Sequence, residues 1–343
     1  MTVSETGVDI RPLGAEHGAE ILSVVESALG TGFRGGRTLE WWAWKHQENP
    51  FGQSYLLGAF DGDQLVGVRA FLQWTLLLGE ARLRCVRAVD TATLPAYQGK
   101  GIFRRLTLAA LEQVHEDGIG AVFNTPNSKS GSGYLKMGWQ PVSALKVALR
   151  PSGVGGLFRM LAAVLGRSAT AANVSREPDH HLPSFSTWFD GLSAAGRSQA
   201  VTSLSRQSEC IGTAWDEAAL RWRFANNPVA DYRVLATDDL ADWVVIRLNE
   251  RRGLREGVVS LACVTRGRLS ALLKHAAGDV DYWVWRPGDV PGRAMAAWRN
   301  GFLPLPLKAM NLVTRQVSAS DAEFTVLLSP ANWHLEFADL ELL

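Results

Sequence analysis

Cysteine is scarce in this sequence, and the few cysteines are far apart. Cys85, Cys210 and Cys263 are the only three in 343 residues, and none belongs to a Cys-x-x-Cys pair. An odd and scattered set of this kind does not predict a disulfide framework and favours a reducing compartment. Since no paired spacing typical of zinc ligands is present, we expect no metal site and a cytoplasmic protein.

Net charge and long apolar runs are also lacking. The 35 basic and 34 acidic side chains leave a formal net charge of +1, so the sequence has no excess of the kind that nucleic-acid-binding proteins carry. No stretch reaches the roughly 18 apolar residues that a membrane span needs. The N-terminal stretch MTVSETGVDIRPLG has no basic-then-apolar signal pattern. We therefore expect neither a nucleic acid nor a membrane as partner, and the sequence leaves the oligomeric state open.

Apolar side chains are abundant, and their spacing changes along the chain. They form 47% of the sequence, which predicts packed cores, and the length suits two domains of about 100–200 residues each. In the first half, the apolar periods predict helices and strands in the order β-β-β-α-β-α-β after two N-terminal helices. The strands are expected at 55–60, 65–78, 81–94, 121–125 and 139–149. This order predicts a mixed α/β fold.

Two short motifs of the first half recur in the second half. WKHQENP at 44–50 is matched by WRFANNP at 222–228, and YLKMGWQP at 134–141 is matched by AWRNGFLP at 297–304. Repeats in the same order predict a duplicated domain. We therefore expect a first domain at 1–150, a linker with a short helix at 151–185 and a second domain at 186–343. The linker's apolar piece GLFRMLAAVLG is interpreted as a helix between the domains rather than as a membrane anchor.

A glycine-rich stretch, PAYQGKGIFRRL at 95–106, lies between a predicted strand and a predicted helix. Such a turn makes an anion site, because helix N–H groups and the positive end of the helix dipole converge there. Gly99 and Gly101 allow close approach of the backbone, and Lys100 adds a charge. An ordinary strand-to-helix turn is the simpler alternative. A dinucleotide fingerprint would need a third glycine, and a P-loop motif is absent.

The pattern resembles the pyrophosphate loop Q/R-x-x-G-x-G/A of the GNAT acetyltransferase superfamily. The residues aligned with this pattern are Gln98, Gly99, Lys100, Gly101, Ile102 and Phe103. All fit it except Phe103, which stands where the family usually has glycine or alanine. Downstream, NTPNSKSGSGYLKMGW at 124–139 resembles the family's fifth strand and its Y-x-K-x-G-F/W element. The resemblance implies two GNAT-like domains, each with a mixed, mostly antiparallel sheet flanked by helices. It also implies binding of acetyl-CoA as co-substrate.

The resemblance also implies roles for individual residues. Backbone groups near Thr91 and Thr93 would pair with the pantetheine arm where the fourth and fifth strands separate. The N–H groups from 99 to 103 would hold the pyrophosphate, and Asn127 would bond the cofactor arm. Tyr134 would protonate the departing thiolate, and its alternative role is that of a packed aromatic ring.

The residue that accepts the amine's proton is less clear from the sequence. Family members often have a glutamate midway along the fourth strand, and Arg87 stands at that position here. Asp90 is the nearest carboxylate, although simple alternation turns it to the opposite face of the strand. A water relay or Glu40 remains an alternative to Asp90. Trp41 and Trp42, on one of the first helices, are candidates to line the acceptor site.

The second half lacks the residues that carry this chemistry. Its segment CVTRGRLSALLKHAAG has only Gly267 before the helix, and Ala297 occupies the position of Tyr134. We therefore expect a degenerate second domain and an active first domain. The predicted function is transfer of an acyl group, expected to be acetyl, from CoA to an amine of a small-molecule or peptide acceptor. One alternative is a CoA-binding sensor or partner protein without catalysis. Another is an unrelated α/β domain that binds a different phosphate ligand. The near-zero net charge disfavours aminoacyl-tRNA as a substrate.

Overall fold

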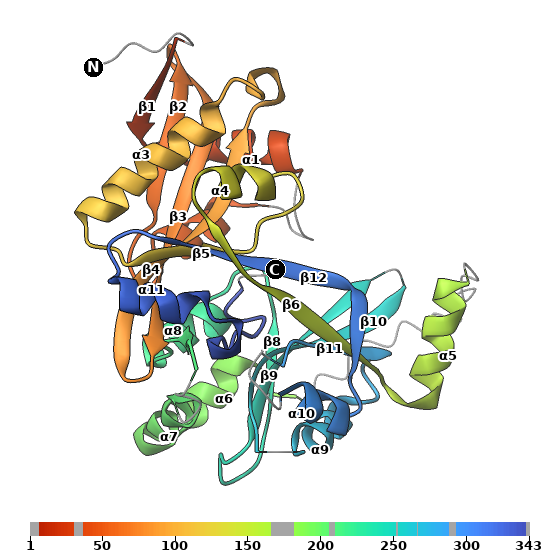
Figure 1. Cartoon of the computed structure of the whole chain (residues 1–343). Coiled ribbons are helices and arrows are strands. Elements are labelled where there is room, and N and C mark those ends of the chain that lie inside the picture. The colour runs from red at the N-terminus through yellow and green to blue at the C-terminus, as the bar shows by residue number, and fades with distance from the viewer. Residues whose placement is uncertain are drawn as a thin grey trace. The chain divides into compact units, whose positions relative to one another are not determined.

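The computed structural model describes residues 7–30, 37–165, 182–205, 210–251, 253–265, 267–287 and 293–340 (Figure 1). The chain forms two compact units that exchange segments. The first unit contains Met1–Ser143, Asn227–Val229 and Asn311–Ser329, and the second contains Ala144–Asn226, Ala230–Met310 and Pro330–Leu343. The boundaries at 150 and 186 expected from the sequence do not anticipate this exchange. Within the linker expected at 151–185, residues 166–181 lie outside the described part.

The first unit is built on a mostly antiparallel sheet. Its strands are β1 (Val8–Pro12), β2 (Tyr55–Asp61), β3 (Gln64–Leu78), β4 (Ala81–Thr93), β5 (Ala121–Asn124) and the last part of β12 (Leu303–Gln316). β1 to β4 pair antiparallel in chain order, β4 pairs parallel with β5, and β5 pairs antiparallel with β12. The β2–β3 hairpin turns at Gly62, whose φ of +60° suits a tight turn. The mixed α/β fold with a mostly antiparallel sheet is confirmed.

Helices cover this sheet. The helical elements of the first unit are η1 (Ala15–His17), α1 (Gly18–Leu29), α2 (Leu39–His46), η2 (Pro95–Tyr97), α3 (Ile102–Glu116), α4 (Gly131–Lys136) and α11 (Asp321–Leu328). α3 packs on β2 and β3, and it crosses in front of these strands in Figure 1. Its apolar stripe, from Ile102 through Leu106 and Ala110 to Val114, joins Val66 and Phe71 of the sheet in one buried core. This packing fixes the start of α3 at the end of the glycine-rich stretch.

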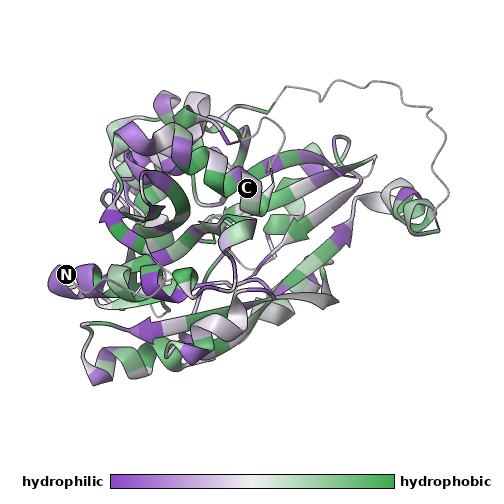
Figure 2. Ribbon diagram, turned by 90° about the horizontal axis from the view of Figure 1, so that it is seen from above, coloured by the Kyte–Doolittle hydropathy of each residue, from purple (hydrophilic) through white to green (hydrophobic). Residues whose placement is uncertain are grey.

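The second unit repeats the strand order of the first. Its strands are the last part of β6 (Gln140–Pro151), β7 (Gly212–Thr213), β8 (Tyr232–Ala236), β9 (Trp243–Arg251), β10 (Leu254–Cys263) and β11 (Tyr282–Trp285). β8, β9 and β10 pair antiparallel, β10 pairs parallel with β11, and β11 pairs antiparallel with β6. β8 to β11 therefore repeat the pairings of β2 to β5, as the duplicated motifs predicted. Figure 2 shows hydrophobic stretches along the strands.

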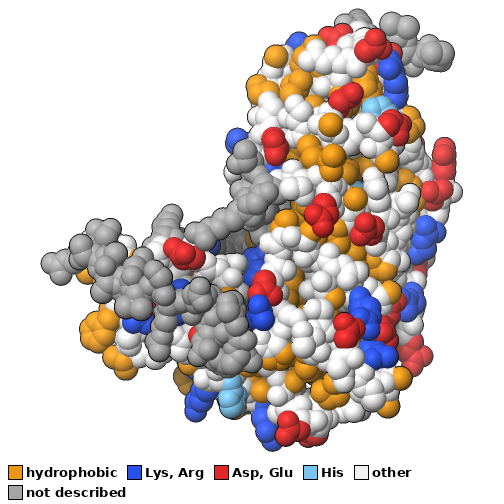
Figure 3. Space-filling model, turned by 180° about the vertical axis from the view of Figure 1, so that it is seen from behind, with side chains coloured by type: hydrophobic (Ala, Val, Ile, Leu, Met, Phe, Trp, Pro, Cys, Tyr) orange, Lys and Arg blue, Asp and Glu red, His pale blue; other side chains and the backbone are white. Residues whose placement is uncertain are grey.

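The second unit also contains helical elements. They are α5 (Gly153–Val164), α6 (Phe185–Gly191), α7 (Ala194–Ser205), α8 (Glu217–Leu220), η3 (Arg221–Ala225), α9 (Leu269–Leu273), η4 (Lys274–Ala276), α10 (Arg293–Arg299) and η5 (Pro330–Asn332). α5 lies within the segment in which a linker helix was expected. On the face of the molecule in Figure 3, acidic and basic side chains are intermixed, in keeping with the net charge of +1.

Candidate active site

Strands β4 and β5 pair over only a short parallel stretch in the first unit. Their parallel pairing ends at Arg87↔Phe123, whereas β4 continues beside β3 as far as Thr93. Thr91 and Thr93 lie on this continuation, beyond the last β5 partner. β5 itself ends at Asn124, so these two threonines have no β5 partner, and pairing of their backbone with an extended ligand arm stays a prediction.

The glycine-rich stretch has the backbone geometry of an anion site. Gly99 and Gly101 have φ values of +77° and +76°, and no atom lies within 4 Å of a Cβ added at either position. Gly101 is the N-cap of the 15-residue helix α3. The N–H groups of a helix's first turn have no partner within the helix, and the dipole adds positive potential there. The loop is thus suited to a phosphate group.

Two polar side chains complete this loop. Gln98 donates a hydrogen bond from Nε2 to the carbonyl oxygen of Thr93 (3.1 Å), which joins the loop to the end of β4. Lys100 is exposed, and its Nζ lies 4.6 Å from the centre of the Tyr97 ring. The ammonium group is therefore held near the loop, where it can add its charge to the backbone donors.

The next two residues anchor the start of the helix. Ile102 is 2% exposed and belongs to the core under α3. Phe103 lies edge-to-face on Tyr134, with the ring centres 5.4 Å apart, and a Cβ added at Gly133 would be 3.0 Å from the Phe103 ring. The side chain that departs from the family pattern therefore packs against α4. Only the Phe103 N–H remains as a candidate ligand group.

Asn127 organises the loop before α4. Its Oδ1 accepts hydrogen bonds from the N–H groups of Lys129 and Ser130 (3.0 Å each) and from the Ser130 hydroxyl (3.1 Å). This is an Asx-type turn that leads the chain into the helix. Since Oδ1 is used by the loop, a bond to a cofactor would have to come from Nδ2.

Tyr134 lies on α4 and is 3% exposed. Its Oη accepts a hydrogen bond of 2.7 Å from Nη1 of Arg69, a residue of β3. The ring lies edge-to-face on Phe103 and on Trp139. Because Oη accepts from the guanidinium, the phenolic hydrogen is left to point elsewhere, as a proton donor requires. Sequence reasoning missed Arg69, whose only signal is a lone arginine in the apolar run QLVGVRAFLQWTLLL.

A β-bulge sets the direction of Asp90. Between the pairs Ala70↔Val89 and Val68↔Ala92, two residues of β4 oppose one of β3, and Asp90 has a φ of +41°. The bulge breaks the alternation on which the sequence-based orientation relied, so that expectation was wrong. The Asp90 carboxylate instead contacts two residues of α2: it pairs with Lys45 and lies 3.2 Å from His46 Nε2.

These contacts bear on the predicted role of Asp90 as general base. Burial alone raises the pKa of Asp90, but the charge of Lys45 and the hydrogen bond with His46 outweigh it and hold the pKa below its usual range. His46 extends the network through Nδ1 to the Ser54 hydroxyl (2.8 Å). A carboxylate held this way is a weak proton acceptor. The general-base role stays a prediction that these contacts do not favour.

Trp41 and Trp42 pack inside the first unit. They are 4% and 2% exposed, and Trp42 lies against the His46 ring with centres 4.0 Å apart. Lys45 Nζ lies 4.6 Å from the centre of the Trp41 ring. Both tryptophans therefore surround the buried ion pair. Their predicted contact with an acceptor remains a prediction, and little of their surface is open to one.

The described residues of the second unit do not form a corresponding site. Gly267 has a φ of +83°, but the following helix α9 has only five residues, and Ala297 stands where Tyr134 stands in the first unit. Beyond the last β11 partner, β10 bonds to the chain's own C-terminal part: Ala338 N–H donates to Ser260 O (2.9 Å) and Ala262 N–H donates to Glu336 Oε2 (2.6 Å). The strand edge that separation would expose is therefore occupied.

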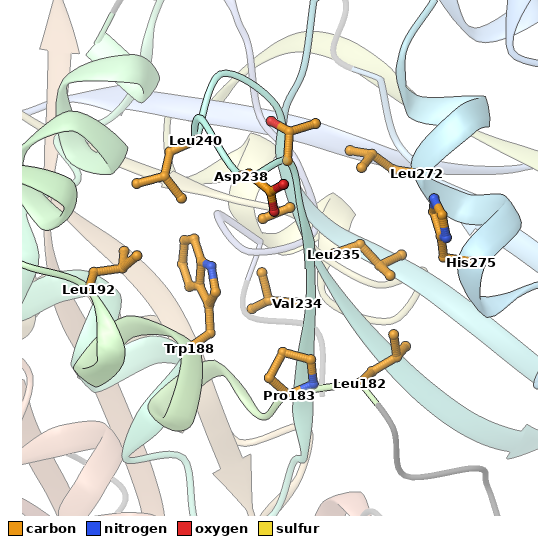
Figure 4. Close-up of a pocket in the computed structure, with 12 residues that line it drawn as sticks. Leu182, Pro183, Trp188, Leu192, Val234, Leu235, Asp238, Leu240, Leu272 and His275 are labelled. Carbon is orange, nitrogen blue, oxygen red and sulfur yellow. The ribbon is translucent and has the colours of Figure 1, made fainter.

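A cavity of about 550 Å³ lies elsewhere in the second unit. Trp188, Leu192 and Leu235 contribute apolar surface, and Asp238 and His275 contribute polar groups at its rim (Figure 4). Among the described residues, no group of His, Cys, Asp and Glu is arranged to hold a metal ion. No described helix is long and apolar enough to cross a membrane.

Known proteins resemble this chain in part of its sequence and in its fold. A family model described as an acetyltransferase (GNAT) domain matches residues 9–142. No curated protein sequence matches the chain. A GCN5-related N-acetyltransferase from Anabaena variabilis ATCC 29413 superposes with a TM-score of 0.63 and 12% identity, over 90% of this chain and 73% of its own.

Two further solved structures have the same fold. A GCN5-related N-acetyltransferase from Kribbella flavida has a TM-score of 0.61 and 14% identity over 92% of this chain and 73% of its own. Eis1 from Mycobacterium abscessus has a TM-score of 0.56 and 16% identity over 94% and 76%. The TM-scores and the coverage of this chain show a shared fold across both units. Residues 9–142 therefore match the acetyltransferase (GNAT) domain family, and the superpositions show this fold over most of the chain.

Proposed function

We propose that the first unit transfers an acyl group, acetyl in the first instance, from CoA directly to an amine of a small-molecule or peptide acceptor. One observation carries the proposal. The same unit combines two left-handed glycines before a 15-residue helix, a strand β4 that runs beyond its last β5 partner, and a tyrosine hydroxyl whose oxygen accepts a hydrogen bond from a guanidinium. Each feature serves a different part of an acyl-CoA, and the second unit does not combine them.

The residues would divide the work as follows. The N–H groups of Gly99–Phe103 and the charge of Lys100 hold the pyrophosphate, and the backbone near Thr91 and Thr93 pairs with the pantetheine arm. Asn127 bonds the arm through Nδ2. Tyr134 gives its proton to the sulfur as the thioester carbon–sulfur bond breaks.

The amine must be neutral to attack the thioester carbonyl, so its proton has to leave. Asp90 is the carboxylate on the β4 bulge, and its ion pair with Lys45 makes it a poor acceptor at neutral pH. We therefore favour release of the proton to water, with Asp90 holding α2 against β4. A direct role for Asp90 predicts that Asp90→Asn abolishes turnover while leaving binding of acetyl-CoA intact.

The proposal is tested by measuring thiol release from acetyl-CoA with a panel of amines, from amino sugars to peptide N-termini. We expect turnover with at least one class of amine, and a loss of at least about 100-fold in kcat for Tyr134→Phe with little change in acetyl-CoA affinity. Tight binding of acetyl-CoA without turnover on any amine would contradict the proposal and favour a CoA-binding sensor. Nucleotides that compete as well as CoA would indicate a different phosphate ligand.

A further inference from the structure

Arg69 is a buried cation in the middle of the first unit's sheet. It is 0% exposed and lies on β3 opposite the bulge of β4. Arginine stays protonated in proteins, so its charge is present in the interior at any working pH. A buried charge is costly unless it is paired and hydrogen-bonded. Its partners therefore decide whether this residue has a function.

The guanidinium bridges two elements of the candidate site. Its Nη1 donates to Tyr134 Oη on α4 (2.7 Å) and to Thr91 Oγ1 on β4 (2.5 Å). The Thr91 hydroxyl in turn donates to the carbonyl oxygen of Val89 across the bulge (3.2 Å). Arg69 thus connects the expected proton donor to the strand that would carry the thioester arm.

The charge of Arg69 has no carboxylate partner among the ion pairs of the described residues. Its Nε and Nη2 are buried without a hydrogen-bond partner in that part of the chain. The surroundings are aromatic: the guanidinium carbon lies 4.5 Å from the centre of the Phe71 ring, 5.3 Å from Tyr134 and 5.8 Å from Phe103. Ring faces and two neutral oxygens compensate only part of the charge.

We propose that Arg69 is a positioning residue that enables Tyr134 to protonate the leaving thiolate. A free phenol ionises near pH 10 and a free thiol near 8.5, so transfer of a proton from tyrosine to a thiolate is unfavourable by about 30-fold. A cation in contact with Oη stabilises the phenolate that this transfer creates, and the low-dielectric surroundings strengthen the effect. The Arg69 charge has no carboxylate partner among the described residues in the resting state, and the Tyr134 phenolate becomes its anionic partner during the reaction.

The atoms balance in this sequence. The amine nitrogen bonds to the acyl carbon, the carbon–sulfur bond breaks with its electron pair on sulfur, and the Tyr134 proton passes to sulfur. The phenolate then regains a proton, through water, from the amine. Arg69 changes neither bonds nor protonation state. The inference rests on the proposed acyl transfer, but it makes a claim about Tyr134 that can be measured without an acceptor.

The first test is an alkaline titration of tyrosinate absorbance at 295 nm, in which subtraction of the Tyr134→Phe spectrum isolates the Tyr134 signal. We expect this signal to move to higher pH, by at least one unit, in Arg69→Met, because that variant lacks the cation next to the Tyr134 oxygen. Equal titration of the wild type and Arg69→Met would overturn the inference and leave the proposed acyl transfer untouched.

The second test is kinetic and uses the amine identified with the panel. Arg69→Met should lower kcat by about 30-fold and change KM for acetyl-CoA by less than about threefold, because the interaction acts in the transition state. The double variant Arg69→Met/Tyr134→Phe should be no slower than Tyr134→Phe alone. Fully additive losses would show that Arg69 does not act through Tyr134.

Thermal unfolding separates this role from a structural one. Since an uncompensated buried charge is removed, Arg69→Met is expected to unfold at the same temperature as the wild type or higher. Lower activity with unchanged or higher stability supports the inference. A lowered unfolding temperature with full activity in the folded fraction would make Arg69 a structural residue.

Discussion

At the scale of single residues, the buried ion pair of Lys45 and Asp90 holds α2 against β4. Their side chains are 5% and 9% exposed, and His46 and the Trp41 ring close the remaining sides. Two charges taken out of water this completely cost several kcal/mol each, which their mutual attraction and hydrogen bonds offset. Removal of one partner leaves the other buried and uncompensated.

Asp90→Asn should therefore lower the free energy of unfolding by about 3–5 kcal/mol, measured by urea denaturation at pH 7. Because Lys45 and His46 hold the pKa of Asp90 below its usual range, the stabilisation is complete above about pH 5 and is lost progressively as the pH falls further. The wild type should lose stability below pH 4 more steeply than the variant. A variant as stable as the wild type at pH 7 would contradict this role for the pair.

The residues that could be predicted from the sequence are those whose signal is local. Gly99 and Gly101 stand in one short stretch, and their left-handed backbone follows from the chemistry of glycine. The contact of Arg69 with Tyr134 spans 65 positions, and no local pattern announces it. The bulge at Asp90 contains no glycine to mark it, so alternation along β4 led to the wrong orientation.

At the scale of elements, the strand that follows β5 in space comes from the far end of the sequence. β5 pairs with Val313–Gln316 of β12, and residues 311–329 belong to the first unit. β6, the next strand along the chain, pairs instead with β11 through Ala148–Pro151. The apolar spacing predicted the strands at 121–125 and 139–149, but the choice of partner strand depends on tertiary packing, so the boundaries drawn from repeats alone could not include it.

A fragment of residues 1–143 should consequently fail to fold, because it leaves the backbone of β5 unpaired beside a buried core. Circular dichroism and urea denaturation would show no cooperative transition. Joining residues 309–329 to the fragment through a flexible linker should restore one. Cooperative unfolding of residues 1–143 alone would show that β12 is dispensable for the first unit.

At the scale of the whole molecule, the two units repeat one strand order, but among the described residues only the first unit has the complete set of predicted site residues. The first unit has the glycine pair, the long helix α3 and Tyr134, whereas the second has one glycine, the short helix α9 and Ala297. In the second unit the edge of β10 is also bonded to Glu336 and Ala338. A repeated strand order therefore does not imply two cofactor sites, because function depends on the residues placed on each unit.

The most direct measurement is isothermal titration of acetyl-CoA into Gly101→Asp and its matched control Gly267→Asp. Each glycine precedes a helix, has a positive φ and leaves open space where the Cβ of a new side chain would lie. Aspartate tolerates this backbone conformation better than most residues. We predict one binding site per chain in the wild type. Gly101→Asp should bind acetyl-CoA at least about 100-fold more weakly, because its carboxylate lies against the pyrophosphate. Gly267→Asp should bind acetyl-CoA with unchanged affinity. Undiminished affinity of folded Gly101→Asp, or two sites per chain, would contradict the account.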